Sequence, residues 1–130
     1  MQTGKRKSKC YVLKVHVLAY QYAYLQRLQA IRTEDTGSKC TSGELIRESL
    51  HLLRVFYKAY ATEARPLRLP GFLMAGNADK MEDLTVCIRK EQHEWLKKAA
   101  NSARFVADEY ITNASLVRLG IELLREKYPC

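Results

Sequence analysis

Apolar and polar residues alternate in two short stretches of the chain. The apolar positions are Leu13, Val15 and Val17 in the first stretch and Leu84, Val86 and Ile88 in the second. Alternation with a period of two predicts a strand that has one buried face and one exposed face. We therefore expect strands over residues 11–17 and 82–88.

Each predicted strand is followed by two segments in which apolar residues recur at helical spacing. These segments predict helices over about 20–33, 41–57, 91–105 and 112–127. Thr41 and Glu44 have the spacing of a capping box at the start of the second helix. Prolines and glycines interrupt residues 58–82, which predicts a linker between two similar halves.

The two halves are related by an internal duplication at an offset of 71 residues. Eleven aligned positions are identical without a gap, among them Gln21 with Gln92 and Arg47 with Arg118. Similarity at a fixed spacing marks a repeated structural unit. One strand and two helices neither satisfy the strand's backbone groups nor bury enough apolar surface. We therefore expect the two strands to pair antiparallel over helices from both copies.

The net charge is concentrated at the front of the chain. The 130 residues include 22 Lys+Arg and 14 Asp+Glu, a net charge of +8, and much of the excess lies in Lys5, Arg6, Lys7 and Lys9. Two interpretations stay open for this segment. It is a solvated, solubilising tail, or it is an arm that meets a polyanion.

Several classes of protein are not expected from this sequence. No run of 18 apolar residues is present, and Lys14 and His16 interrupt the apolar stretch that resembles a signal peptide. We therefore expect a cytoplasmic protein with reduced thiols and no membrane partner. The sequence has no cysteine pairs at the spacing of a zinc site, no nucleophile motif and no phosphate-binding glycine loop. We expect no enzymatic activity, no metal and no cofactor.

The repeated unit resembles the ribbon-helix-helix family of transcription regulators. The resemblance is carried by VLKVHV with TSGELIRESLHLL, and by LTVCIRKEQHEWLKKAA with TNASLVRLGIELL. It implies a mainly α fold with one short two-stranded antiparallel β-ribbon, in which two units are fused into a pseudo-dimer. The implied organisation is a basic arm (1–9), one repeat (10–57), a linker (58–82) and a second repeat (83–130). Tandem units of this kind resemble small regulators of archaeal viruses, which would act in the host cytoplasm.

The resemblance implies sequence-specific binding to double-stranded DNA, with repression of transcription as the expected outcome. In this family the ribbon enters the major groove and its outward side chains contact base edges. The matching positions here are Val12, Lys14, His16, Asp83, Thr85 and Cys87. Because the two sets differ, we expect an asymmetric or imperfect palindrome as the operator.

The resemblance also implies phosphate contacts at the start of the second helix of each unit. The matching residues are Thr41, Ser42, Gly43, Thr112, Asn113 and Ala114, and the arm residues Lys5, Arg6, Lys7 and Lys9 would neutralise further phosphates. Helix capping alone is an equally good interpretation of the six helix-start residues.

Three other helix positions have structural interpretations. For Arg47 and Arg118, a structural ion pair with Glu44 or another acid is favoured over a phosphate contact. Gly120 lies in mid-helix and its counterpart is Ser49, so we expect a tight helix crossing there.

Two alternatives to an intramolecular DNA-binding unit remain. In the first, the chain is a protein-interaction module, such as an antitoxin-like partner, and residues 58–82 are the candidate binding segment. Alternatively, each unit pairs with another chain, which gives dimers or arrays along DNA.

Overall fold

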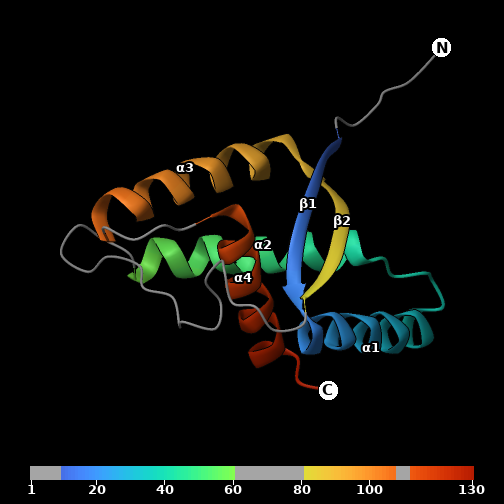
Figure 1. Ribbon diagram of the computed structural model, residues 1–130. Coiled ribbons are helices and arrows are strands. Elements are labelled where there is room, and N and C mark those ends of the chain that lie inside the picture. The colour runs from blue at the N-terminus through green and yellow to red at the C-terminus, as the bar shows by residue number, and fades with distance from the viewer. Residues whose placement is uncertain (1–9, 61–80, 108–111) are drawn as a thin grey trace, which may run out of the picture.

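The computed structural model describes residues 10–60, 81–107 and 112–130 (Figure 1). In chain order the elements are β1 (Cys10–Leu18), α1 (Ala19–Thr36), α2 (Ser42–Tyr60), β2 (Met81–Arg89), α3 (Lys90–Ala107) and α4 (Asn113–Lys127). The two strands form one antiparallel sheet. The predicted class, mainly helical with a two-stranded antiparallel ribbon, is confirmed.

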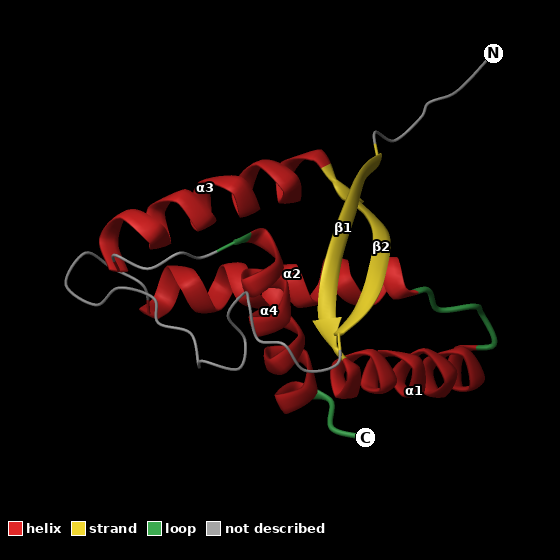
Figure 2. Ribbon diagram, in the orientation of Figure 1, coloured by secondary structure: helices red, strands yellow, loops and turns green. Residues whose placement is uncertain are grey.

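The helices are arranged around the ribbon so that each half of the chain contacts the other. In Figure 2, α1 and α3 leave opposite ends of the ribbon, while α2 and α4 lie beside it. α2 contacts β2 and α4 contacts β1, and α2 and α4 pack against each other. Each strand is therefore covered by the second helix of the other half.

The strand register places residues of the two repeats opposite one another. Lys14 lies opposite Thr85, which is also its counterpart in the duplication, and Val15 lies opposite Leu84. The buried alternating residues are Leu13, Val15, Val17, Leu84, Val86 and Ile88, and Leu18 at the end of β1 is buried as well. This confirms the predicted assignment of the two ribbon faces.

A close crossing joins α2 and α4 in the core. A Cβ atom added to Gly120 would lie only 2.9 Å from the main-chain oxygen of Ser49. Ser49 is fully buried, and its hydroxyl donates to the Ile46 carbonyl at 2.8 Å. The predicted tight crossing at Gly120 is confirmed, and it brings the two counterpart residues together.

Two glutamines make matching contacts in the two halves. The Gln21 amide donates to the carbonyl oxygen of Arg118 at 3.0 Å, and the Gln92 amide donates to that of Arg47 at 3.1 Å. Each glutamine oxygen also accepts the main-chain N–H three residues before it, at 3.1 and 3.2 Å. Each junction between strand and helix is thus bound to the second helix of the other half.

Most helices extend beyond their predicted ends. α1 continues to Thr36 and ends at Gly37, whose φ of 75° favours glycine. α2 continues through residues 58–60 into the predicted linker. These extensions contain no proline or glycine, so nothing in them stops a helix that is already formed. Met81 and Glu82, the last residues of the predicted linker, belong to β2, and residues 61–80 lie outside the described residues.

Replacing Tyr24 with phenylalanine is expected to lower the free energy of unfolding by about 1 kcal/mol. The buried Tyr24 hydroxyl donates to the carbonyls of Leu124 and Tyr128 at 3.1 and 2.7 Å. Burial raises the pKa of this phenol to about 12, above its ordinary value of about 10. The neutral form is therefore favoured by folding, and this contribution is lost as pH rises from about 10 to 12.

Urea unfolding at neutral pH measures the stability lost in Tyr24→Phe, and unfolding at alkaline pH measures the effect of the raised pKa of Tyr24. Tyr24→Phe should lose less stability than the native chain between about pH 10 and 12. Tyr22→Phe, which leaves the Tyr24 hydroxyl in place, is the matched control. An unchanged pH dependence in Tyr24→Phe would contradict the expectation.

Candidate nucleic-acid interface

The outward side chains of the ribbon form one surface that carries both polar and apolar groups. Five of the six predicted base-contact residues are exposed, and Cys87 is half-buried. The strand register brings them together as three cross-strand pairs, which are Val12 with Cys87, Lys14 with Thr85, and His16 with Asp83. A two-stranded ribbon has the width that the major groove of B-DNA admits. The predicted positions therefore share one surface of suitable shape.

The two ends of this surface differ chemically. At one end, His16 Nδ1 lies 2.6 Å from Asp83 Oδ1, and both side chains are largely exposed. At the other end, Val12 is 63% exposed and lies opposite Cys87. The centre, between these two pairs, holds Lys14 and Thr85. The two halves of a bound duplex would therefore meet different groups.

Cys87 is disulfide-bonded, so the prediction that all thiols are reduced was wrong. Cys40, which is buried, and Cys130, which is exposed, are free cysteines. Cysteine spacing along a chain does not show which sulfurs a fold brings within bonding distance. As a result, Cys87 presents no thiol on the outward surface.

The starts of α2 and α4 are capped by equivalent threonines. Thr41 Oγ1 accepts from Glu44 N at 3.2 Å, and Thr112 Oγ1 accepts from Ser115 N at 3.1 Å. This confirms the capping role of the two threonines. An oxygen cap satisfies only one of the unpaired N–H groups in a first turn, so the remaining groups still favour an anion.

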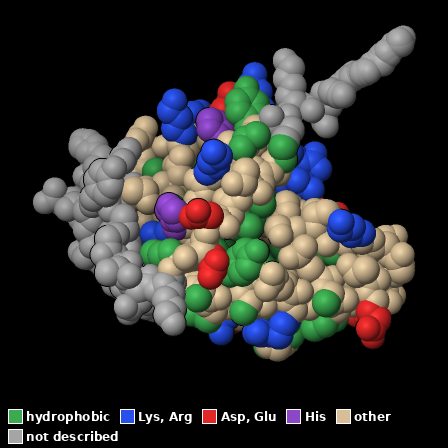
Figure 3. Space-filling view, turned by 45° about the vertical axis from the view of Figure 1, so that its right-hand side comes forward, with side chains coloured by type: hydrophobic (Ala, Val, Ile, Leu, Met, Phe, Trp, Pro, Cys, Tyr) green, Lys and Arg blue, Asp and Glu red, His purple; other side chains and the backbone are tan. Residues whose placement is uncertain are grey.

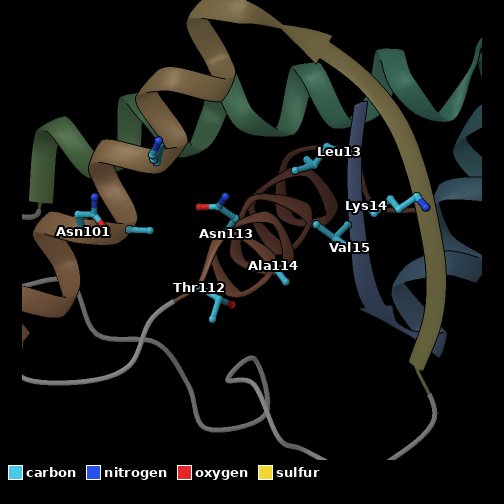
Figure 4. A pocket seen from close by; sticks show the side chains of 9 residues that line it. Leu13, Lys14, Val15, Asn101, Thr112, Asn113 and Ala114 are labelled. Atoms are coloured by element: carbon cyan, nitrogen blue, oxygen red, sulfur yellow. The ribbon is translucent and has the colours of Figure 1, made fainter. Parts of the chain in front are cut away.

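The start of α4 borders a pocket of about 420 Å³ between α3 and the ribbon. Its lining is Leu13, Lys14, Val15, Lys97, Ala100, Asn101, Thr112, Asn113 and Ala114. In Figure 4, Leu13 and Val15 point from β1 toward α4, whereas Lys14 points to the opposite side of the ribbon. The three residues predicted at the start of α4 therefore line a pocket next to the ribbon.

Lys97 and Asn101 belong to this site but were not among the predicted residues. They lie four positions apart on α3, so they share one helix face. That spacing was available in the sequence, but many surface helices carry such pairs. Only the packing of α3 beside α4 shows that this face borders the α4 start.

The start of α2 has a different environment. The Gln29 amide donates to the Cys40 carbonyl at 3.2 Å, and its oxygen accepts from Ser42 Oγ at 3.1 Å. These bonds join α1 to the loop and to the start of α2. The counterpart of Gln29 is Ala100, which has no polar group to form such a bridge. The two predicted phosphate positions are therefore not equivalent.

Arg47 and Arg118 support the ribbon from behind. Arg118 is 2% exposed, and its Nη1 donates to the His16 carbonyl at 2.6 Å. Arg47 Nη1 donates to the Cys87 carbonyl at 2.8 Å. Burial lowers the pKa of Arg118. These contacts favour the structural role, with strand carbonyls rather than the carboxylate of Glu44 as partners.

Gly43 lies close to the Arg47 side chain and to the ribbon. A Cβ atom added there would lie 3.2 Å from Arg47 Nη1 and 3.6 Å from the Cys87 carbonyl oxygen. These short distances place Gly43 beside the ribbon, and they do not depend on a bound phosphate.

Basic side chains are dispersed over the face seen in Figure 3, with acidic ones between them. The predicted arm residues Lys5, Arg6, Lys7 and Lys9 lie outside the described residues. Within residues 10–60, 81–107 and 112–130, no three metal-binding side chains gather into a candidate ion site. No helix in the same ranges has the length and apolar character needed to cross a membrane.

Comparisons of the chain with protein-family models, with curated proteins and with solved structures gave no match. A function assigned to this chain therefore rests on its own sequence and structure.

Proposed function

We propose that this protein is a sequence-specific double-stranded DNA-binding transcription regulator that acts as a repressor. The observation that carries the proposal is the outward face of the ribbon, where six candidate base-contact residues share one surface. The starts of α2 and α4 carry partial positive charge that suits backbone phosphates. Occupation of a promoter by such a unit would exclude the transcription machinery.

The proposal includes two ribbon-helix-helix units fused into one pseudo-dimer. Reciprocal contacts support it, because a two-fold interface brings the same residues of both copies together. Lys14 pairs with its counterpart Thr85, and Ser49 contacts its counterpart Gly120. The glutamine and arginine bonds to the opposite half are also matched. A pseudo-two-fold axis through the ribbon centre accounts for all of these contacts.

The centre of the ribbon supplies the hydrogen-bonding groups for base reading. The Lys14 ammonium donates to guanine O6 and N7, and the Thr85 hydroxyl donates or accepts while its methyl contacts thymine. Both side chains are exposed and lie opposite each other. Toward one end, Val12 adds an apolar contact for a thymine methyl group.

Selection of binding sites from a random pool of duplex DNA tests the proposal. We expect the native chain to recover a consensus sequence. The double variant Lys14→Ala/Thr85→Ala should bind that consensus at least about 30-fold more weakly, since it removes two base contacts and each good contact contributes about 1–3 kcal/mol of discrimination. Both residues are exposed, so circular dichroism should show an unchanged fold.

Lys58→Ala is the matched control, because it removes one positive charge from an exposed site late in α2. It should leave the consensus and its affinity nearly unchanged. Recovery of no consensus, with binding that disappears at moderate salt, would contradict sequence-specific recognition. That outcome would point instead to the protein-interaction module.

A further inference from the structure

The His16–Asp83 pair has a geometry that determines which nitrogen of the imidazole carries a proton. The distance from Nδ1 to Asp83 Oδ1 is 2.6 Å, a hydrogen-bond distance. An ionised carboxylate only accepts hydrogen bonds, so Nδ1 must be the donor. In the neutral ring, the proton is then on Nδ1 and the lone pair is on Nε2.

We propose that Asp83 is a positioning residue that holds His16 in this state, so that Nε2 contacts a base edge in one half of the operator. This inference rests on the proposed DNA binding and adds a pH-dependent base preference to it. When the ring is neutral, Nε2 accepts from the amino group of cytosine or adenine. When the ring is protonated, Nε2 donates to guanine O6 or N7.

The surroundings of the pair leave Nε2 available to DNA. The His16 and Asp83 side chains are 66% and 85% exposed. The charged groups nearest to them along the ribbon are Lys14 on β1 and Glu82 on β2, both exposed. From α4, the Arg118 guanidinium donates to the main-chain oxygen of His16 and so anchors this end of the strand.

Asp83 has a different role here from the one predicted from the sequence. As an isolated carboxylate it would accept directly from cytosine N4. In the structure, its Oδ1 faces His16 across the ribbon. The base-reading group at this end is then the histidine, and the aspartate determines its orientation and tautomer.

The other end of the ribbon provides an internal control. Val12 does not titrate, and Cys87 opposite it is disulfide-bonded. No group that titrates near neutral pH is therefore presented by that pair. A pH effect on base preference should appear in one operator half only.

Site selection at about pH 5.5 and about pH 8 tests the inference, because histidine ordinarily changes charge between these values. In the native chain, we expect base preference in one half-site to change by about three- to tenfold, as one hydrogen bond contributes about 1 kcal/mol. The other half-site should keep its preference. His16→Gln should remove the change, and Asp83→Asn should weaken the preference for an amino group at the higher pH.

Imidazole ¹⁵N chemical shifts of the full chain without DNA give a second, independent measurement. We expect the Nδ1–H tautomer for His16 in the native chain and a gain of Nε2–H in Asp83→Asn. A native Nε2–H tautomer would overturn the inference, as would a consensus with the same preferences at both pH values. Absence of any consensus would instead refute the proposed function, and with it base reading by His16.

Discussion

Replacing Gly120 with alanine is expected to lower the free energy of unfolding by about 1–3 kcal/mol, the usual cost of overpacking a core. Alanine is the better helix former by about 1 kcal/mol, so propensity alone predicts the opposite sign. The added Cβ would lie 2.9 Å from the oxygen and 3.3 Å from the carbonyl carbon of Ser49. Because these are main-chain atoms inside a helix, the contact is relieved only if α2 and α4 move apart. Denaturant unfolding measures the change.

Gly43→Ala is the matched control for this substitution. Its Cβ would lie 3.2 Å from Arg47 Nη1, which is the far end of a flexible side chain. The counterpart of Gly43 is Ala114, next to the equivalent arginine, Arg118. We expect Gly43→Ala to change stability by no more than about 0.5 kcal/mol. A Gly120→Ala variant as stable as the native chain would show that α2 and α4 have room for a Cβ atom at their crossing.

Replacing Arg118 with methionine is expected to destabilise the fold by about 1–3 kcal/mol. The Arg118 guanidinium is buried and donates to the His16 carbonyl at 2.6 Å, with a longer contact to Ser115 Oγ at 3.4 Å. Methionine fills similar space but leaves the carbonyl without this donor. Release of a desolvated charge offsets part of the loss. The same desolvation lowers the pKa of Arg118, because burial disfavours the charged guanidinium.

Arg47→Met in the other repeat is the comparison. Arg47 makes the equivalent bond to Cys87, but its side chain is half-buried, so water has better access to the vacated position. We expect a smaller loss of stability, below about 1 kcal/mol. Equal losses in the two variants, measured by thermal or denaturant unfolding, would show that burial does not distinguish these arginines.

Features with a short sequence period were predictable from the residues alone. The alternation around Val15 and Val86 identified both strands and their buried faces, because side chains on a strand point to opposite sides in turn. The duplication identified Ser49 as the counterpart of Gly120, and a glycine in mid-helix suggested close packing there. The positions of the helix ends were harder to predict, because a helix that meets no proline or glycine continues as long as packing against other elements stabilises it.

The sequence predicted most of the residues that form the candidate site, but not how those residues contact one another. The residue pattern alone was enough to predict which residues face outward on the ribbon and which lie at the starts of α2 and α4. The folded chain was needed to show that His16 contacts Asp83 and that Cys87 is disulfide-bonded. It also shows that Gln29 bridges the start of α2 while Lys97 borders the start of α4. The His16–Asp83 pair joins two different strands, and the Gln29 bond to Cys40 uses a main-chain oxygen, which every residue has. Periodicity and spacing describe one segment at a time, so they carry no information about such pairs.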